Sequence, residues 1–315
     1  MERQPSHAAA VYWFRMTPLL ALALAVAEFD GRWNITPEQE GRKRVWWLEV
    51  KASGTPAISG NFVGAHGGQV DAIPNIKIEG NELIWVFDRS GDKRTYRARI
   101  AGGALKGAME IAGQPDKKIS FSGKRAPILK EIDDANWKAG TPVELFNGKD
   151  MSGWGPAAPG RKLDWFVENG AMKNRDKAAD ITTAARFWNF DLHIEYKVAQ
   201  HSNSGVGLRG RYEVQIFGDH GEQPSKHGNG ALYSRIVPTM NATKAPAEWQ
   251  TFDIRLIGRQ VTVVLNGKTL IDHKTIDGFT AMATDVNEDQ PGPLTLQGDH
   301  GPVEFRKITV TPLHR

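Results

Sequence analysis

The chain contains no cysteine in its 315 residues. This absence excludes disulfide bonds, thiolate catalysis and any zinc or iron–sulfur site built on cysteine ligands. An excess of one charge is also missing, since 40 basic residues face 36 acidic ones and no basic block carries interleaved aromatic residues. We therefore expect no nucleic-acid partner. No apolar run approaches the ~20 residues that span a bilayer, so we expect no integral membrane segment.

The N-terminus carries a short apolar run at residues 19–27, with Arg15 before it. Residues 25–27 read Ala-Val-Ala, the small-x-small pattern that precedes a signal-peptidase cleavage site. Residues 1–27 are therefore predicted to be a signal peptide, and the mature protein to be periplasmic or secreted. A buried helix of the first domain is the alternative interpretation of this run.

A sustained helical period is missing from the following residues, and short alternating runs bounded by glycine-containing turns take its place. In residues 28–125 these runs predict strands at residues 45–51, 58–63, 76–78, 82–87, 95–100 and 119–122. Strands this short and closely spaced predict a small antiparallel β-barrel or sandwich domain. Its two ends, residues 30–33 and 121–125, resemble those of small lipocalin-like barrels.

Residues 126–140 are polar and predict a linker, with one turn of helix at residues 131–137. Longer strands follow, and residues 190–198 alternate between apolar and polar side chains without a break. Asn266-Gly267 is a strong signal for a two-residue hairpin. These features predict an all-β domain over residues 141–315, in which two antiparallel sheets pack through their apolar faces.

Polar residues recur on the open faces of these strands and in the loops beside them. The set that could carry chemistry is Glu195, Arg209, Glu213, Gln215, Gln297, His300 and Arg306. Two carboxylates on one sheet face serve as acid and base or as ligands of a hard cation, and a histidine in a glycine-flanked loop titrates near neutral pH. The alternative is a set of solvated polar faces with arginine partners, beside a surface-loop histidine.

Three further residues are candidates for sugar binding. Asp219 lies in a Gly-Asp-His-Gly loop, and loops at the end of a sheet often carry ligand-binding groups. The aromatic rings of Trp154 and Tyr233 can stack on the apolar face of a pyranose. Packing in the core is the alternative for each ring.

A series of motifs occurs in the second part of the chain, at residues 145–154, 203–209, 212–216, 230–233, 248–250, 265–267 and 296–308. In this order they resemble the 3-keto-disaccharide hydrolase domain family over residues 141–312. The resemblance implies a jelly-roll sandwich similar to concanavalin A-like lectins and glucanases. The sequence departs from the family pattern at Lys307 and at residues 217–219.

The resemblance also implies an enzyme that acts on small oligosaccharides or glycosides already oxidised at C3. A carbonyl at C3 acidifies the C2 proton, so a base can remove that proton and the enolate can expel the C1 substituent. Water then adds back if the outcome is hydrolysis. Such a site needs a base, an acid and a group that stabilises the enolate oxygen. The substrate in turn implies a partner oxidoreductase that produces 3-keto sugars.

Under this hypothesis the base is His300 or Glu213. Arg209 and Arg306 would stabilise the enolate, and Gln215 and Gln297 would bind the sugar hydroxyls. No cofactor is certain from the sequence. A divalent cation stays open as the enolate stabiliser, with Glu195, Glu213 and His300 as its candidate ligands.

Other classes of function remain. An ordinary glycosidase of this architecture carries Glu-x-Asp-x-x-Glu on one strand, whereas Gln215 and Gly218 occupy the second and third acidic positions after Glu213. This difference argues against an ordinary glycosidase. A non-catalytic carbohydrate-binding module and a structural envelope protein are the further alternatives, because a fold alone does not determine function.

Overall fold

The computed structural model describes residues 27–38, 44–65, 68–175 and 177–315. Regular structure in this part of the chain is β-strand apart from one 3₁₀ turn, η1 (Ala27–Phe29), which confirms the all-β prediction. The predicted signal peptide lies outside the described residues except for Ala27. No helix in the described ranges is long and apolar enough to cross a membrane.

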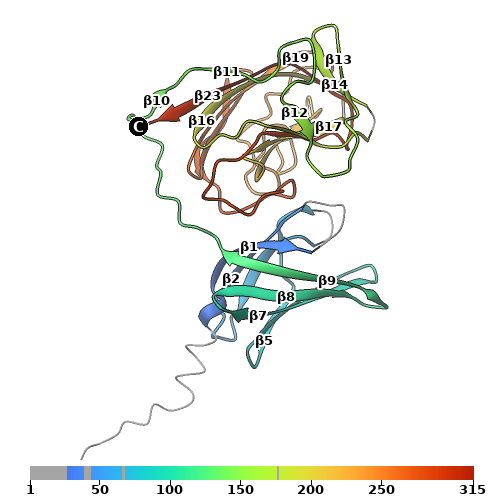
Figure 1. The fold of residues 1–315 in the computed structure, drawn as a ribbon, viewed down its shortest axis with the longest axis vertical. Helices are drawn as coiled ribbons and strands as arrows, with labels where there is room; N and C mark the ends of the chain where they lie inside the picture. The colour runs from blue at the N-terminus through green and yellow to red at the C-terminus, as the bar shows by residue number, and fades with distance from the viewer. Residues whose placement is uncertain (1–26, 39–43, 66–67, 176) are drawn as a thin grey trace, which may run out of the picture.

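Two β-rich units are joined by an extended segment (Figure 1). The first unit, which we call the N-terminal half-barrel, is one antiparallel sheet whose end strands do not pair with each other in the described residues. In spatial order its strands are β4 (Asp71–Ala72), β3 (Ser59–Val63), β2 (Trp46–Lys51), β1 (Gly31–Pro37), β9 (Gln114–Arg125), β8 (Ala104–Ile111), β7 (Asp92–Ala101), β6 (Glu82–Arg89) and β5 (Asn75–Glu79).

Aromatic rings fill the inside of the half-barrel. Trp85 stacks on Tyr96 with ring centroids 5.0 Å apart, and Phe62 packs edge-on against both. Near the first strand Trp33 is fully buried, and the guanidinium of Arg125 lies 4.0 Å from the centre of its ring. The interior is therefore a packed core, which suits the large apolar area that each aromatic side chain buries.

The second unit is a sandwich of two antiparallel sheets, which confirms the predicted two-sheet jelly roll. The large sheet contains β13 (Trp165–Glu168), β14 (Ala171–Asn174), β23 (Val303–His314), β16 (Phe190–Val198), β19 (Trp249–Ile257), β20 (Gln260–Leu265) and β21 (Lys268–Thr275), with β10 (Lys138–Ala139) and β11 (Val143–Glu144) also paired to β23. The small sheet contains β12 (Trp154–Pro156), β15 (Ile181–Thr183), β22 (Thr295–Leu296), β17 (Asn203–Leu208) and β18 (Tyr212–Phe217).

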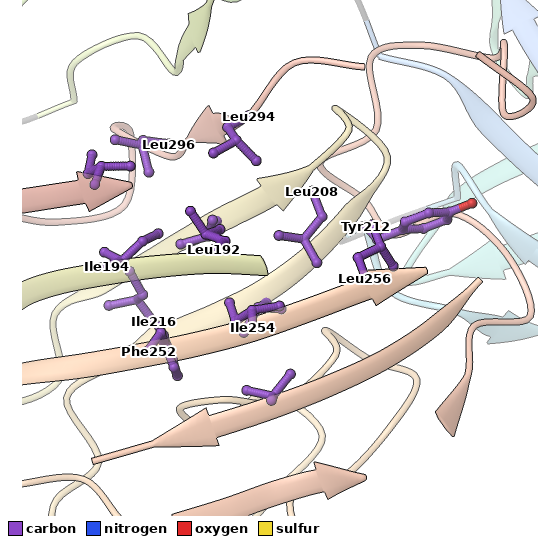
Figure 2. Packing of buried hydrophobic residues seen from close by; sticks show 14 of the residues in the cluster. Leu192, Ile194, Leu208, Tyr212, Ile216, Phe252, Ile254, Leu256, Leu294 and Leu296 are labelled. Atoms are coloured by element: carbon purple, nitrogen blue, oxygen red, sulfur yellow. The ribbon is translucent and has the colours of Figure 1, made fainter. Parts of the chain in front are cut away.

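The apolar faces of the two sheets meet in one core, as the alternating pattern predicts (Figure 2). Every second residue of β16 is buried along the whole strand. Leu192 of β16 and Ile254 of β19 pack in the same cluster as Leu208 and Leu296 of the small sheet. The predicted hairpin is also confirmed, because Asn266-Gly267 joins β20 to β21 with positive φ at both residues.

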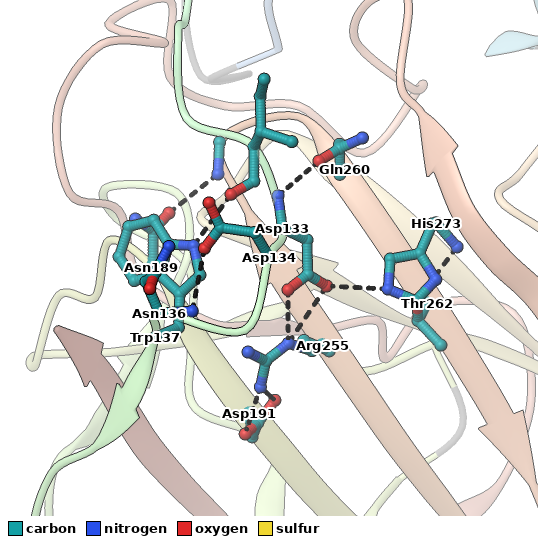
Figure 3. Close-up of polar contacts among 12 residues, drawn as sticks. Asp133, Asp134, Asn136, Trp137, Asn189, Asp191, Arg255, Gln260, Thr262 and His273 are labelled. Carbon is teal, nitrogen blue, oxygen red and sulfur yellow. Dashed lines mark hydrogen bonds and ion pairs between the residues drawn. The ribbon is translucent and has the colours of Figure 1, made fainter. Parts of the chain in front are cut away.

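The segment that joins the two units has no helix, so the predicted helical turn at residues 131–137 is wrong. The carboxylate of Asp133 accepts hydrogen bonds from Arg255 Nε at 3.0 and 3.1 Å, and His273 Nε2 lies 3.4 Å from it (Figure 3). The backbone N of Asp133 donates to Gln260 Oε1. These contacts with β19, β20 and β21 fix the backbone, so tertiary structure outweighs local helix propensity here.

The half-barrel and the sandwich share a hydrophobic core at their junction. Val45, Trp47 and Val63 of the half-barrel belong to the same buried cluster as the sandwich core. The fully buried ring of Trp47 lies against Gly278, and the guanidinium of Arg235 lies 4.4 Å from the ring centre. A shared apolar core holds two units in one relative position.

Replacing Gly278 with alanine is expected to destabilise this junction. A β-carbon at this position would lie 2.2 Å from the ring of Trp47, which is too close for a buried ring to tolerate. Overpacking of this kind costs about 1–3 kcal/mol, which urea unfolding followed by tryptophan fluorescence would measure. Gly155→Ala is the control, because a β-carbon there meets nothing within 4 Å. Equal stability of the two variants would contradict close packing at the junction.

Candidate active site

The small sheet carries a polar face on the side that points away from the core. The apolar residues of β18 face the core, so Glu213 and Gln215 lie on the opposite face. Both side chains are nevertheless buried, with 2% of their surface exposed. One of the loops beside this face contains Thr280, whose hydroxyl accepts a hydrogen bond from the backbone N of Glu213. Two polar side chains on a sheet are thus withdrawn from solvent.

A glycine on the neighbouring strand makes room for Glu213. The first six residues of the motif at residues 203–209 form β17, which pairs with β18. A β-carbon built on Gly205 would lie 2.5 Å from Glu213 Oε1. The carboxyl group therefore lies across the backbone of Gly205, in space that any other residue would fill. This close approach gives a physical reason for a glycine in the motif.

Charged residues from three distant segments surround Glu213. Arg44 lies two residues before β2, Asp180 directly precedes β15, and the Asp299-His300 loop follows β22. Arg44 Nη2 lies 2.8 Å from Asp180 Oδ2, and His300 Nδ1 is hydrogen-bonded to the carboxylate of Asp299. The backbone N of Gly298 donates to Asp180 Oδ1 at 3.1 Å, and the backbone N of Gln297 donates to the backbone O of Gly205, the residue that the Glu213 carboxyl group lies across. These contacts bring the segments together beside Glu213, and the charges of all four charged residues act on its pKa. We call Glu213 and these four residues the Glu213 cluster.

Burial and hydrogen bonding both set proton affinities in this cluster. Burial raises the pKa of Glu213 to about 8, although the positive charge of Arg44 acts in the opposite direction. Burial also raises the pKa of Asp180. The hydrogen bond to Asp299 raises the pKa of His300 above its ordinary value of 6.5. Glu213 therefore keeps its proton at neutral pH, while His300 holds its proton more tightly than an ordinary histidine.

Two amides beside Glu213 carry buried oxygen atoms without a partner in the described residues, Oε1 of Gln215 and Oε1 of Gln297. Gln215 Nε2 donates to Asn203 Oδ1 at 3.1 Å, which fixes the orientation of that amide. Tyr233 borders the same place, because its backbone N donates to the backbone O of Glu213 at 3.0 Å. Unpaired buried acceptors are costly, and a ligand rich in hydroxyl groups would satisfy them.

Glu195 and Arg306 lie on the large sheet, so the expectation that Glu195 shares a face with Glu213 is wrong. Glu195 on β16 forms an ion pair with Arg306 on β23, and the guanidinium of Arg306 lies 4.4 Å from the ring of Trp249. All of these contacts are on the solvent-exposed side of the large sheet. Alternation identifies the polar face of each strand, but it does not reveal which sheet the strand joins.

Arg209, Asp219 and Trp154 also lie outside the Glu213 cluster. The expectation that Arg209 gathers with Glu213 is therefore wrong, whereas sugar binding by Asp219 and Trp154 stays a prediction. Arg209 is fully buried, and its guanidinium lies 4.3 Å from the ring of Trp188. Asp219 accepts hydrogen bonds that tie its loop to neighbouring segments. Trp154 is buried and donates to a backbone carbonyl at 2.7 Å. Each of these side chains makes its contacts within the sandwich.

The three candidate ligands for a cation do not come together. Glu195 lies on the large sheet, whereas Glu213 and His300 belong to the Glu213 cluster. No group of three or more His, Asp or Glu side chains within the described ranges could hold a metal ion. The hypothesis that Glu195, Glu213 and His300 form one ligand set is therefore wrong.

Two cavities lined by described residues lie away from the Glu213 cluster. One of about 710 Å³ lies where residues 125–132 pass Arg32 and Arg259. The other, of about 590 Å³, lies on the half-barrel beside β5 and β6. Neither is lined by a residue of the Glu213 cluster. These two cavities therefore do not coincide with the place where the perturbed titratable groups gather.

Three members of the cluster, Arg44, Asp180 and Asp299, were not found from the sequence, although Asp299 adjoins the predicted His300. Asp180 directly precedes β15, a strand of only three residues with no alternation long enough to recognise. Arg44 lies outside the residues that resemble the family. Arg44 and Asp180 are 136 positions apart, and an ion pair over that separation has no local sequence signal.

Comparison with known protein families places the second unit among carbohydrate-active domains. Residues 141–311 match the family described as the 3-keto-α-glucoside-1,2-lyase-like domain. The chain belongs to this family, which confirms the resemblance found in the sequence. No curated protein matches the chain.

Solved structures that resemble this chain include two candidate glycosyl hydrolases and a carbohydrate-binding module. A candidate glycosyl hydrolase from Parabacteroides distasonis ATCC 8503 is 28% identical, with 59% of this chain and 94% of that chain covered and a TM-score of 0.48. A second candidate glycosyl hydrolase from the same organism is 22% identical, with 55% and 94% covered and a TM-score of 0.46. A carbohydrate-binding module from Bacillus subtilis is 14% identical, with 51% and 97% covered and a TM-score of 0.35.

The raised pKa of Glu213 predicts a specific dependence of stability on pH. The native carboxyl group holds its proton up to about pH 8, whereas an unfolded glutamate releases it near 4.5. The native state therefore loses stability as pH rises through this interval. Glu213→Gln removes the titration, so the variant is expected to gain on the order of 4 kcal/mol relative to wild type between about pH 5 and pH 9.

Urea unfolding of both proteins across this range measures the difference. Glu248→Gln, at an exposed loop position, is the control, and its difference from wild type is expected to stay flat. A flat difference for Glu213→Gln would show that the buried carboxyl group titrates like one in water.

Proposed function

We propose that the second unit cleaves the glycosidic bond of sugars oxidised at C3, beginning with removal of the C2 proton. The observation that carries this proposal is a carboxyl group that keeps its proton at neutral pH beside a histidine paired with an aspartate. Groups with separated proton affinities are typical of acid–base catalysis. Membership of the 3-keto-α-glucoside-1,2-lyase-like family supports the choice of substrate.

The proposed reaction is an elimination. The base takes the proton from C2, and the electron pair of that C–H bond forms the enolate of the C3 ketone. The enolate then re-forms the carbonyl, a C1–C2 double bond appears, and the C1–O bond breaks as the leaving oxygen takes a proton from the acid. Addition of water to the product gives net hydrolysis. The substrate implies an oxidoreductase that oxidises C3 beforehand.

Each role is assigned by protonation state. His300 in its neutral form is the base, because Asp299 orients its ring and increases its basicity. Glu213 is the acid, because it still carries a proton at neutral pH. The unpaired amide oxygens of Gln215 and Gln297 accept hydrogen bonds from sugar hydroxyls. These assignments use groups that share one polar face.

Steric evidence within the sandwich argues against an ordinary glycosidase. The third acid of that motif would stand at Gly218, where a β-carbon would lie 1.9 Å from the backbone O of Ala199. A glutamate cannot occupy this position without a shift of the backbone. Since Gln215 replaces the second acid, the strand offers only Glu213 for chemistry, which favours a substrate with its own acidic proton.

The proposal predicts that purified protein releases the aglycone from a 3-keto-glucoside and leaves the unoxidised parent glycoside intact. Deuterium at C2 is expected to slow the release. Glu213→Gln and His300→Gln are each expected to lower the rate by about 10²–10⁴-fold, the usual contribution of general acid–base catalysis. Glu195→Gln, on the other sheet, is the control and is expected to keep the wild-type rate.

The outcomes separate the alternative functions. Release from both substrates would indicate ordinary glycosidase chemistry. Release from neither, with the sugar still bound in calorimetry, would indicate a carbohydrate-binding module. A parallel assay with a chelator tests whether a metal ion takes part.

The same assignment predicts a bell-shaped pH dependence of kcat/KM. The rate is expected to rise as His300 loses its proton, above its ordinary value of 6.5, and to fall above about pH 8 as Glu213 loses its own. Glu213→Gln is expected to remove the falling limb, because the amide does not titrate. A falling limb that persists in this variant would assign the acid to another residue.

A further inference from the structure

The polar face is completed by a residue from outside the part of the chain that matches the family. That part covers residues 141–311, whereas Arg44 lies two residues before β2 of the half-barrel. Arg44 Nη2 lies 2.8 Å from Asp180 Oδ2, and Arg44 Nη1 donates to the backbone O of Ala281 at 3.3 Å. Both partners belong to the sandwich, so Arg44 reaches across the junction.

The position of Arg44 is fixed by the residues that follow it. The backbone N of Val45 donates to the backbone O of Ala283 at 3.0 Å, and its side chain is buried in the sandwich core. Two residues later, the buried ring of Trp47 packs against Gly278. The start of β2 is therefore bound to the sandwich, and this fixes the position of the Arg44 guanidinium.

The guanidinium is held without being enclosed. The Arg44 side chain is 24% exposed, whereas the side chain of Asp180 is 10% exposed. An arginine carries five N–H donors, and the two contacts recorded in the described residues use one on Nη1 and one on Nη2. Donors remain for a ligand that meets the polar face. Arg44 can therefore bind an oxygen of the substrate while Asp180 holds it in place.

We propose that Arg44 binds the C3 oxygen of the 3-keto sugar and stabilises the negative charge that develops there when the C2 proton leaves. This inference rests on the proposed function and adds a residue that lies outside the family domain. A fixed charge aimed at a developing oxyanion is effective because it needs no reorganisation during the reaction. Asp180 is then a positioning residue, and the half-barrel is part of the catalytic unit.

The charge of Arg44 also reaches Glu213, where it is the largest effect that opposes burial. Loss of this charge therefore raises the pKa of Glu213 further. The difference in unfolding free energy between wild type and Glu213→Gln reports this pKa without any substrate. A second measurement on Arg44 is thus independent of the reaction.

The experiment compares Arg44→Gln and Arg44→Lys with Arg32→Gln in the full chain. Arg32 is the matched control, because its Nη1 also donates across the junction, to the backbone O of Asp277 at 2.6 Å. With a 3-keto-glucoside, Arg44→Gln is expected to lower kcat/KM by about 100-fold or more, and Arg44→Lys by less. Arg32→Gln is expected to stay within about fivefold of wild type.

Arg44→Gln leaves the buried carboxylate of Asp180 without its partner, and this change alone could unfold the protein. The double variant Arg44→Gln/Asp180→Asn removes that charge and is expected to fold with the same loss of kcat/KM. In the background of Arg44→Gln, the titration of Glu213 is expected to move to higher pH. In the double variant the shift is expected to be smaller, because the charge of Asp180, which raises the pKa of Glu213, is lost together with that of Arg44.

The outcomes distinguish this inference from the proposed function. An active wild type with an Arg44→Gln variant within about fivefold of it overturns the role of Arg44 and leaves the proposed function standing. An inactive wild type overturns the proposed function and, with it, the contact to a C3 oxygen. In that case a shifted Glu213 titration still supports Arg44 as a residue of the polar face, and an unshifted one overturns this placement as well.

Discussion

A carboxyl group buried on a polar face is the constraint on which the rest of the site depends. An ionised carboxylate is expensive to withdraw from water, and Glu213 meets this cost by holding its proton. The space it occupies exists because Gly205 has no side chain. The charges around it, Arg44 with Asp180 and His300 with Asp299, come as opposite pairs, so none adds an isolated charge to a region of low dielectric constant.

The stability that holds these groups in place comes from packing elsewhere. The two apolar sheet faces of the sandwich form one core, and that core extends through Val45, Trp47 and Val63 into the half-barrel. Segments at the edges of this core carry the polar groups: Asp180 before β15 and the Asp299-His300 loop after β22. The rigid sheets thus fix the loops that carry the titratable side chains. These side chains are held in position even where they do not contact one another directly.

The sequence predicts those parts of the molecule that rest on local patterns. Alternation in β16, glycine-bounded turns and the Asn266-Gly267 hairpin are local, and the structure confirms each of them. Glu213 and His300 were likewise found from a strand pattern and a loop motif, and they do come together. Glu195 was placed wrongly because the alternation along its strand shows which face of a sheet the side chain occupies, but not which of the two sheets the strand joins. Arg44 and Asp180 could not be found, since their pairing depends on how two separately folded units meet, which no short stretch of sequence encodes.

The filled interior of the half-barrel has a consequence for how this unit can change. Trp85 and Tyr96 stack where a cargo-carrying barrel would be hollow, so the inside is free to be repacked with other apolar side chains of similar volume. The rim that meets the sandwich has no such freedom, since Arg44 and Trp47 each fit one place across the junction. If the half-barrel were replaced by that of a homologous chain, the residues of its interior could therefore differ. The residues where the chain enters β2 would have to be kept.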